Sequence, residues 1–415
     1  MSLSQKARVL VVGSGGREHA LAAALASSPS VGEVAFAGGP NAGLEAIAQR
    51  IMPSDVFARA KEFDLVVIGP EAPLVDGIAD RIGAQSIPVF GPSAAAAQLE
   101  ASKAFTKDLC VKAGIPTADA KVCETEMSAF AALWSMGAPI VVKADGRAAG
   151  KGVVVATTND EAEAAIKFCF SGGFGSAGAK VLLEERLEGP ELSLFALCDG
   201  TTVKPLATAR DYKRAFDRDE GSNTGGMGAI SPAPDVPPAV VERAMAEIVR
   251  PAIETLAARG TPYVGVLYAG LILTAEGPKL IEFNVRFGDP ECQAIMPLLA
   301  TDPFELMHAV ATGRLAEIEV AIRPETAVAV VVASAGYPQK VEMGEAIGGL
   351  DALSENALLY HAATRRDGSS VFSNGGRVLG VVARGEDGAV ARARVYRALE
   401  ALDWPGGRYR RDIGL

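Results

Sequence analysis

The chain has 415 residues, of which 49% are hydrophobic and 22% are charged, so disordered and fibrous classes of protein are excluded and several domains are expected. Forty basic and fifty acidic side chains give a formal net charge of −10, which argues against general binding of nucleic acid or of an anionic membrane surface. Five cysteines without a CxxC pair and three histidines offer no zinc site and no His-rich metal centre.

The amino terminus lacks the charged head, apolar stretch and cleavage site of a secretory signal peptide. The uncharged stretch over residues 260–275 contains Pro262, Gly265 and Gly270 and is too short for a membrane span. An odd number of cysteines fits a reducing compartment. We therefore expect a cytoplasmic protein that acts as a monomer on small molecules, without a membrane or a nucleic acid as partner.

The first hundred residues alternate short apolar runs with helical patterns. Strands are predicted over residues 8–12, 34–37, 65–68 and 89–90, and helices over residues 18–26, 55–61 and 74–81. This alternation predicts an open parallel sheet with right-handed crossovers. A glycine follows each strand, which places glycines at the carboxyl edge of the sheet, where such folds bind ligands.

The pattern changes after residue 102. A helix is predicted over residues 103–113, followed by strands over 140–143 and 153–157, a helix over 160–170, strands over 181–184 and 192–197, a long helix near 240–258, and a hairpin of strands over 264–273 and 279–283. After residue 323, turns recur every 8–12 residues, which is typical of a strand-rich module, here closed by a helix over 389–402. The predicted fold class is therefore a multidomain protein with α/β and α+β parts.

The segment GSGGREHALA lies between the first strand and the first helix. Backbone N–H groups in such a turn bind anions at the helix N-terminus, and Arg17 at its entrance suits an anion. A dinucleotide fingerprint would require glycine at Glu18 and an acidic residue near Ala37, and both are missing. A phosphate-sugar site is therefore favoured over NAD, with a structural turn as the alternative.

A second glycine loop, VVKADGRAAGKGVVV, joins two valine-rich strands. It is not a P-loop, which would require glycine at Asp145 and Ser or Thr at Gly152. Such a loop between antiparallel strands suits a triphosphate, whose charge Lys143 and Lys151 would offset. The alternative, a solvated hairpin tip, is less favoured because a lysine is rarely buried in a strand without a partner.

The segment KLIEFNVRFGDPE is the most informative. Glu282 and Asn284 are two residues apart in a predicted strand and so face the same side. One charged and one neutral oxygen ligand suit Mg²⁺, which completes its shell with phosphates and water. Arg286 continues this face and suits a carboxylate. The alternative, an edge strand with an ion pair, seldom places three polar residues between Ile, Phe and Val.

Two further segments carry weaker signals. VLLEERLEGPELSL, residues 181–194, offers backbone groups for adenine and a carboxylate for ribose, although an exposed acidic turn would look the same. ARDYKRAFDRDEGSNTGGMGAISP, residues 209–232, contains enough glycine for its backbone to approach a substrate, and a mobile surface loop is an equal alternative.

Taken together, GGREHAL, GPEAPLV, KADGRAAGKGV, NTGGMGA, EFNVRFGDPE and NGGRVL resemble the phosphoribosylamine–glycine ligase family, ATP-grasp enzymes of purine synthesis. The resemblance extends from Val9 to Gly414. It implies an N-terminal substrate domain over residues 1–102, an ATP-grasp A domain over 103–122 and 192–325, a mobile B lobe over 123–191 that acts as a lid, and a C-terminal domain over 326–415.

The resemblance also implies a set of site residues, carried over motif by motif. ATP and Mg²⁺ or Mn²⁺ are the implied cofactors, with the metal on Glu282 and Asn284. Those implied to bind ATP are Lys103, Lys143, Gly146, Gly150, Lys151, Gly152, Glu184, Glu185, Leu187 and Glu191. Those implied to bind the other substrates are Gly15, Gly16, Arg17, Glu71, Lys213, Gly225, Gly226, Met227 and Gly228. Asp211, Arg286 and Asp289 are implied to surround the reacting ends as catalytic residues.

Four positions depart from the pattern of the family. Arg147 stands where leucine is usual, Pro190 replaces the first Glu of GEE, Tyr212 replaces a histidine, and Ser222 replaces a proline. Arg147 and Ser222 border glycine loops, so the kinetics of lid closure are expected to differ. None of the four removes an expected metal or phosphate ligand.

The implied reaction is ATP-dependent ligation of glycine to 5-phosphoribosylamine through glycyl phosphate. Lysines, a divalent metal and glycine loops, without a Ser–His–Asp nucleophile, fit phosphoryl transfer, which depends on positioning and charge neutralisation. Three alternatives remain: an ATP-grasp ligase for another carboxylate and amine, a dinucleotide-dependent oxidoreductase built on the first sheet, and a non-catalytic ATP sensor.

Overall fold

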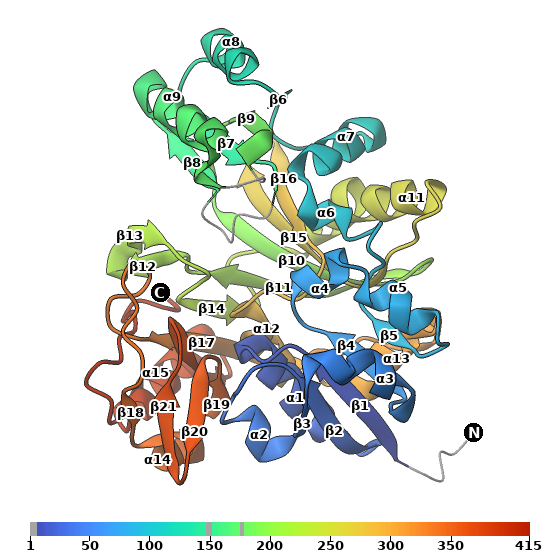
Figure 1. Ribbon diagram of the computed structural model, residues 1–415, viewed down its shortest axis with the longest axis vertical. Coiled ribbons are helices and arrows are strands. Elements are labelled where there is room, and N and C mark those ends of the chain that lie inside the picture. The colour runs from blue at the N-terminus through green and yellow to red at the C-terminus, as the bar shows by residue number, and fades with distance from the viewer. Residues whose placement is uncertain (1–5, 147–151, 175–177) are drawn as a thin grey trace.

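The computed structural model describes residues 6–146, 152–174 and 178–415. An N-terminal α/β domain and a C-terminal strand-rich module lie side by side below a large sheet, and a small lobe projects above it (Figure 1). The described residues include no helix with the length and apolar character that crossing a bilayer requires. The predicted mixture of α/β and α+β parts is confirmed.

The N-terminal domain is a five-stranded parallel sheet in the order β3–β2–β1–β4–β5, which confirms the predicted open parallel sheet. The elements are β1 (Ala7–Val12), α1 (Gly16–Ala26), β2 (Val31–Ala37), α2 (Leu44–Ile47), β3 (Gln49–Ile51), α3 (Val56–Arg59), β4 (Leu65–Ile68), α4 (Glu71–Val75), α5 (Ile78–Gly83) and β5 (Val89–Phe90). Leu10 and Val9 of β1 belong to hydrophobic clusters on opposite faces, which explains the unbroken apolar run of this strand.

The upper lobe, called the B lobe below, is a four-stranded antiparallel sheet in the order β6–β9–β7–β8. The elements that lead to it and form it are α6 (Gln98–Ala101), α7 (Lys103–Ala113), β6 (Ala120–Cys123), α8 (Glu126–Met136), β7 (Ile140–Ala144), β8 (Val153–Ala156), α9 (Asn159–Phe168) and β9 (Val181–Glu185). Leu133, Ile166 and Val181 belong to a hydrophobic cluster within the lobe. The lobe therefore has a core separate from that of the sheet below it.

The large sheet has eight antiparallel strands in the order β16–β15–β10–β11–β14–β17–β22–β19. They are β10 (Glu191–Asp199), β11 (Val203–Asp211), β14 (Gly228–Ser231), β15 (Val264–Thr274), β16 (Gly277–Asn284), β17 (Thr326–Ala333), β19 (Leu358–His361) and β22 (Arg377–Gly385). In the pairing of β14 with β17, Ala229 lies opposite Ala329. One sheet therefore continues across residue 326, where the resemblance sets a domain boundary, and that boundary remains a prediction.

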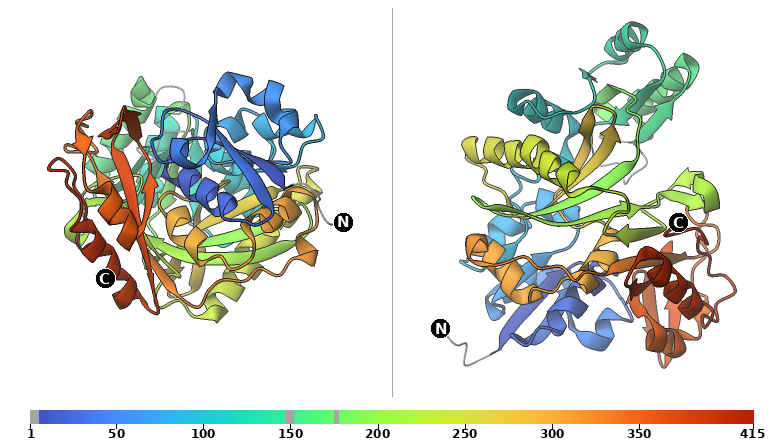
Figure 2. Two further views of the ribbon diagram at one scale, coloured as in Figure 1. Left: turned by 90° about the horizontal axis from the view of Figure 1, so that it is seen from below. Right: turned by 180° about the vertical axis from the view of Figure 1, so that it is seen from behind.

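The remaining elements cover this sheet and extend it. They are the hairpin β12 (Arg214–Phe216) and β13 (Glu220–Asn223), the helices α10 (Pro238–Ala244), α11 (Arg250–Ala258), α12 (Glu291–Ile295), α13 (Pro303–Ala311), α14 (Leu350–Asn356) and α15 (Gly388–Leu399), and the small sheet of β18 (Ala346–Ile347), β20 (Thr364–Asp367) and β21 (Ser370–Ser373). Both views in Figure 2 place the C-terminal module beside the N-terminal domain. One contact between them is the hydrogen bond that the His361 backbone N–H donates to His19 Nδ1 at 2.8 Å.

Candidate active site

A cleft of about 690 Å³ lies between the B lobe and the large sheet, and the N-terminal domain contributes to its wall. Most of the residues that the sequence singles out line it: Arg17, Glu71, Lys103, Lys143, Gly146, Gly152, Glu184, Glu185, Leu187, Glu191, Asp211, Lys213, Gly225, Glu282, Asn284, Arg286 and Asp289. These side chains come from segments nearly three hundred residues apart in the sequence, so the fold brings the separate motifs to one place.

Five residues of the glycine-rich motifs that were expected to contact substrate do not line this cleft: Gly15, Gly16, Gly226, Met227 and Gly228. Packing accounts for two of them. A Cβ at Gly16 would lie 2.7 Å from Gln293 Nε2, and one at Gly228 would lie 2.6 Å from Ile413 Cγ2. Their contact with substrate remains a prediction. Gly150 and Lys151 fall outside the described residues, as does Arg147.

Strand β16 carries the expected metal ligands. Glu282 and Asn284 both line the cleft, and Phe283 between them is buried in the hydrophobic core and also borders the cleft. Asn284 Oδ1 accepts a hydrogen bond of 3.1 Å from Arg286 Nη2. Within residues 6–146, 152–174 and 178–415, the exposed carboxylate of Glu282 has no hydrogen-bond or ion-pair partner.

Several positive charges surround Glu282. Partial burial in the cleft raises the pKa of Glu282. The nearby positive charges lower this pKa by a larger amount, so that it lies below its usual value; they belong to Lys213, Lys143, Lys103 and Arg286. This carboxylate is therefore ionised and available to a cation. In the described part of the chain, no three His, Cys, Asp or Glu side chains gather as a metal cluster. Mg²⁺ usually binds one or two protein oxygens and completes its coordination with phosphate oxygens and water. The pair Glu282 and Asn284 fits this pattern better than a site closed by protein ligands would.

Of the lysines expected at the phosphates, Lys143 pairs with a buried carboxylate, Glu184, which also pairs with Lys107. Glu184 Oε2 lies 2.7 Å from Lys143 Nζ, and Glu184 Oε1 lies 3.3 Å from Lys107 Nζ. Lys103 Nζ donates a hydrogen bond of 3.4 Å to the carbonyl of Gly146. Burial lowers the pKa of Lys103, and the nearby carboxylate of Glu282 opposes that shift. Glu184 therefore orients Lys143 and Lys107, a role that sequence reasoning did not anticipate for it.

A second charged group lies where β10 and β11 meet the cleft. Lys213 forms an ion pair with Glu191, and its Nζ lies 3.8 Å from Asp211 Oδ2. Burial lowers the pKa of Lys213, but Asp211 and Glu191 raise it by more, so the amine is firmly protonated. Burial raises the pKa of Asp211, which Lys213 opposes. The arrangement offers carboxylates and an ammonium group to polar substrate ends.

Arg286 is fixed by two carboxylates. Its Nη2 lies 2.8 Å from Glu100 Oε1, and its Nε lies 3.6 Å from Glu71 Oε2. Glu100 Oε2 also accepts a hydrogen bond of 2.8 Å from the Val285 backbone N–H. The Nε of Arg286 is buried and makes no hydrogen bond of its own. A bound anion could accept a hydrogen bond from the Nε of Arg286. An anion held by both Nη atoms would instead displace the hydrogen bonds that these atoms already make.

Arg17 ties the first helix to the same region. Its Nε donates to Glu18 Oε1 at 2.7 Å and its Nη1 donates to the carbonyl of Phe287 at 2.9 Å. Glu18 Oε2 in turn accepts a hydrogen bond of 2.6 Å from the Gly15 backbone N–H. Glu18, the residue that breaks the dinucleotide fingerprint, therefore fixes the glycine turn and Arg17.

Several further polar residues of the cleft have no role in the sequence reasoning, among them Glu100, Glu291 and Arg377. Burial raises the pKa of Glu291 to about 7, and the neighbouring carboxylate of Asp211 adds to the shift. Arg377 Nη1 donates to the carbonyls of Gly225 and Asp289, both at 2.7 Å. Glu291 lies in the motif FGDPE and Arg377 in the motif NGGRVL. The polar residues of these two motifs could therefore have been predicted as site residues from the sequence.

Three of the residues that depart from the family pattern make local hydrogen bonds, and Arg147 lies outside the described residues. The Tyr212 hydroxyl accepts a hydrogen bond of 3.0 Å from the Gly414 backbone N–H and donates one of 3.3 Å to the Leu415 carbonyl, so it holds the carboxyl terminus. Ser222 Oγ accepts a hydrogen bond of 2.7 Å from Gln339 Nε2. The Pro190 carbonyl accepts one of 3.0 Å from the Leu273 backbone N–H.

Comparison with known sequences assigns this architecture. Models of three domains match the chain: "Phosphoribosylglycinamide synthetase, N domain" over residues 7–100, its "ATP-grasp (A) domain" over residues 101–292, and its "C domain" over residues 327–415. The chain belongs to the phosphoribosylglycinamide synthetase family. The resemblance seen in the sequence motifs is thereby confirmed.

Individual members of the family are similar over their full length. A phosphoribosylamine–glycine ligase of Mesorhizobium japonicum is 51% identical over 98% of this chain and 97% of its own. The crystal structure of phosphoribosylamine–glycine ligase from Thermotoga maritima superposes with a TM-score of 0.86, at 34% identity, and covers 98% of this chain and 100% of that chain. Biotin carboxylase from Campylobacter jejuni, solved as a complex with β-γ-ATP, has a TM-score of 0.73 at 16% identity, covers 98% of this chain and 93% of its own, and so shares the fold.

Proposed function

We propose that the chain ligates glycine to 5-phospho-D-ribosylamine in purine synthesis, with ATP converted to ADP and phosphate. The observation that carries the proposal is that Glu282, Asn284, Lys103 and Lys143 line one cleft, in a family member with full-length relatives named for this ligation. Ionised carboxylate, amide oxygen and ammonium groups around one cavity are what binding a metal–triphosphate complex demands.

The ATP end of the cleft lies below the B lobe. Lys103 and Lys143 are assigned to the phosphates, and Glu282 and Asn284 to Mg²⁺ or Mn²⁺, which when bound would neutralise phosphate charge. The backbone of Glu185 and Leu187 is assigned to adenine. Glu191 is assigned to ribose, and it would then exchange its ion pair with Lys213 for the sugar hydroxyls. Gly146 and Gly152 flank the loop assigned to cover the phosphates.

The other substrates are assigned to the opposite end of the cleft. Arg17 and Glu71 line the wall that the N-terminal domain contributes, and this wall is assigned to phosphoribosylamine. The buried Nε of Arg286 lacks a hydrogen-bond partner and suits an anionic oxygen of the reacting glycine. Asp211 and Asp289 are further carboxylates of the cleft and suit the amine groups.

The reaction then proceeds in two displacements. A carboxylate oxygen of glycine attacks the terminal phosphorus of ATP, so glycyl phosphate forms and ADP leaves. The amine of phosphoribosylamine attacks the glycyl carbonyl carbon, the amide bond forms, phosphate leaves with the electron pair of the broken C–O bond, and the proton lost from the nitrogen goes to the departing phosphate. Because an acyl phosphate hydrolyses readily in water, the B lobe is assigned to cover it until the amine attacks.

Substrate omission tests this proposal. The full chain is incubated with ATP, Mg²⁺, glycine and phosphoribosylamine, and ADP and phosphate release is followed while each substrate is omitted in turn. We expect sustained release of both products only with all three substrates present. Release that continues unchanged without glycine would show that another carboxylate is the acceptor.

A further inference from the structure

Glu100 lines the cleft, and the reaction described above gives it no substrate or metal to bind. It belongs to α6, the short helix that precedes α7. Leu99 of this helix is buried in the same hydrophobic cluster as Phe283 of β16, and its carbonyl accepts a hydrogen bond of 2.8 Å from the Thr106 hydroxyl. The packing of α6 therefore places the carboxylate of Glu100 beside the end of β16, where the expected metal ligands lie.

The two oxygens of this carboxylate have different partners. Oε2 accepts a hydrogen bond of 2.8 Å from the Val285 backbone N–H, and Oε1 accepts one of 2.8 Å from Arg286 Nη2. Val285 directly follows Asn284 in the chain, so the first bond fixes the backbone next to an expected metal ligand. The second bond fixes the guanidinium that is assigned to the reacting glycine. One carboxylate therefore holds a residue on each side of the expected phosphoryl transfer.

Arg286 also contacts Asn284 directly. Its Nη2 donates a hydrogen bond of 3.1 Å to Asn284 Oδ1, in addition to the bond that it donates to Glu100. The amide oxygen accepts such a bond and the amide nitrogen does not, so the position of the guanidinium determines how the Asn284 amide is turned. Glu100, Arg286 and Asn284 therefore form one hydrogen-bonded chain in which a displacement of the first residue is passed to the other two.

The ion pair between Glu100 and Arg286 is better explained by orientation than by stability. The side chains of Arg286 and Glu100 are 18% and 13% exposed. The free energy lost when two charges leave water roughly offsets their attraction, so such a pair contributes little net stability. Glu71 Oε2 lies 3.6 Å from Arg286 Nε, which is too far for a hydrogen bond. Of these two carboxylates, Glu100 is therefore the one that fixes the guanidinium.

We propose that Glu100 is a positioning residue that aligns the phosphate donor with its acceptor. The inference rests on the function proposed above, in which Asn284 holds the metal of ATP and Arg286 holds the carboxylate of glycine. Phosphoryl transfer requires the attacking oxygen, the phosphorus and the leaving oxygen to lie nearly in line. A carboxylate that fixes the residues on both sides keeps the two reactants in that alignment, and a small displacement of either side slows the step.

The variant Glu100→Gln tests the proposal. Its amide keeps the shape of the side chain but offers one acceptor oxygen in place of two, so it cannot keep both hydrogen bonds. We expect kcat of ligation to fall at least tenfold and the KM for glycine to rise several-fold, as measured by initial rates. Calorimetric titration with ADP is a readout that does not depend on turnover. Mg²⁺ should strengthen ADP binding at least threefold less in this variant than in the wild type, because Asn284 is less well oriented.

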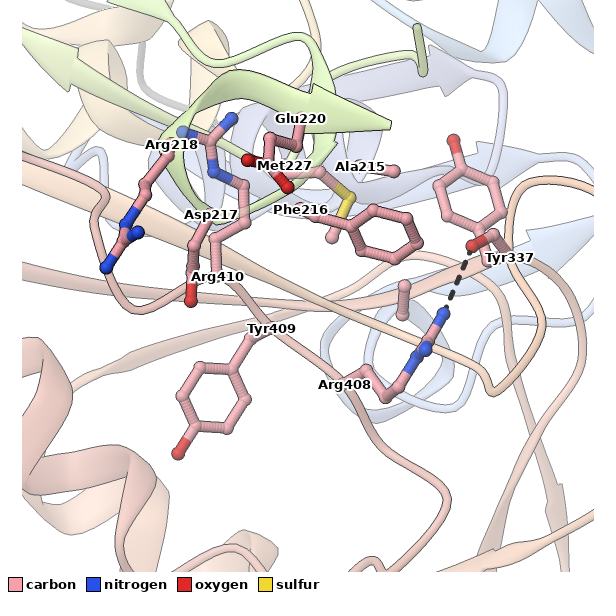
Figure 3. Close-up of a pocket in the computed structure, with 11 residues that line it drawn as sticks. Ala215, Phe216, Asp217, Arg218, Glu220, Met227, Tyr337, Arg408, Tyr409 and Arg410 are labelled. Atoms are coloured by element: carbon pink, nitrogen blue, oxygen red, sulfur yellow. Dashed lines mark hydrogen bonds between the residues drawn. The ribbon is translucent and has the colours of Figure 1, made fainter. Parts of the chain in front are cut away.

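The matched control is Asp217→Asn. Asp217 lines a second, smaller cavity of about 390 Å³, between the β12–β13 hairpin and the C-terminal segment 408–410, and does not line the cleft (Figure 3). Its Oδ1 accepts a hydrogen bond of 2.7 Å from the Arg411 backbone N–H, 194 residues away in the sequence. The bond from Val285 to Glu100 spans a similar 185 residues. Asp217→Asn should therefore keep the wild-type kcat, KM for glycine and effect of Mg²⁺.

Urea unfolding of each variant separates positioning from folding. A merely structural role for Glu100 would lower stability and leave kcat, the KM for glycine and the effect of Mg²⁺ at their wild-type values. That result in folded Glu100→Gln would overturn the proposal. A wild-type chain that does not ligate glycine would instead refute the proposed function, and the ADP titrations would still test the link from Glu100 to Asn284.

Glu100→Asp is the second variant, and it decides the matter if Glu100→Gln does not fold. It keeps the negative charge opposite Arg286, but its side chain is one methylene shorter and cannot reach both Val285 and Arg286. We expect a fall in kcat of at least tenfold in this variant as well, with stability closer to that of the wild type. Wild-type kinetics in Glu100→Asp would show that the charge alone is sufficient and would overturn the positioning role.

Discussion

Glu184 and Lys143 form an ion pair of 2.7 Å on the B-lobe side of the cleft, with their side chains only 4% and 6% exposed. Lys107 approaches the same carboxylate at 3.3 Å, so one buried negative charge serves two buried ammonium groups. Lys107 belongs to α7, below the B lobe, whereas Lys143 and Glu184 belong to strands of the lobe itself. The pairing therefore links the lobe to the body of the protein where ATP is proposed to bind.

We expect Glu184→Gln to destabilise the protein by about 3–5 kcal/mol, because removal of one partner leaves buried charge without compensation. It should also raise the KM for ATP, because Lys143 loses the group that orients it. Urea unfolding and initial-rate kinetics measure the two effects. Glu185→Gln is the matched control, since Glu185 is half-buried and accepts only a hydrogen bond of 3.2 Å from the Asp119 backbone N–H. Equal effects of the two variants would contradict the assigned role.

Arg377 provides a second prediction, because its guanidinium joins the glycine loop to the turn that contains Asp289. Arg377→Lys keeps the charge but loses the geometry that reaches two carbonyls at once. We expect kcat/KM for glycine to fall by roughly 10- to 100-fold, since small misplacements of positioning groups have effects of that size. Arg366→Lys, at an exposed position of β20, is the control. A fall in thermal stability without any change in kinetics would show that Arg377 has only a structural role.

The elements that the sequence predicted are those whose apolar pattern matches their burial. The run of β4, Leu65–Ile68, is buried throughout, and its pattern alone was sufficient to place it. Strand β3, Gln49–Ile51, was not predicted, because two of its three residues are polar and exposed and only pairing with β2 makes it a strand. The helix predicted over residues 240–258 is continuous in the structure, with a π-helical turn at Met245–Val249 that no local pattern indicated.

The candidate site divides in the same way. Glu282 and Asn284 could be predicted as a pair because they are two positions apart in one strand and therefore face the same side. Glu100 and Arg377 could not, because their contacts with Val285 and Gly225 span 185 and 152 residues of the sequence. Such contacts depend on how the domains pack, which a single sequence read locally does not contain.

The histidine pair between the N-terminal domain and the C-terminal module predicts a pH dependence of stability. Burial lowers the pKa of His19 to about 3, and the neighbouring His361 contributes. Burial, with Arg366 nearby, lowers the pKa of His361 to about 4. Between about pH 6.5 and pH 4 the unfolded chain therefore binds more protons than the folded one. Stability should fall as the pH falls through this window, by up to about 1.4 kcal/mol per pH unit for each histidine.

Urea unfolding at a series of pH values measures this slope. His19→Asn removes one of the titrating groups and keeps a side-chain oxygen that can accept the hydrogen bond from the His361 backbone N–H. The variant should lose about half of the pH dependence between pH 6.5 and pH 4. His308→Asn, at a partly exposed position of α13, should change it less. An unchanged slope in His19→Asn would mean that other groups determine the acid sensitivity.

The unpaired carboxylate of Glu282 predicts how metal and nucleotide binding depend on each other. Glu282→Gln keeps the shape of the side chain and removes the charge, so the cleft would keep its lysines but lose its anionic metal ligand. We expect Mg²⁺ to strengthen ADP binding to the wild type and to have little effect on the variant, with ligation abolished; calorimetric titrations with and without Mg²⁺ measure the difference. Glu276→Gln, at the exposed β15–β16 turn where Glu276 pairs with Lys279 at 2.8 Å, is the control and should behave as the wild type does. Mg²⁺-dependent ADP binding that survives in Glu282→Gln would place the metal on other residues of the cleft.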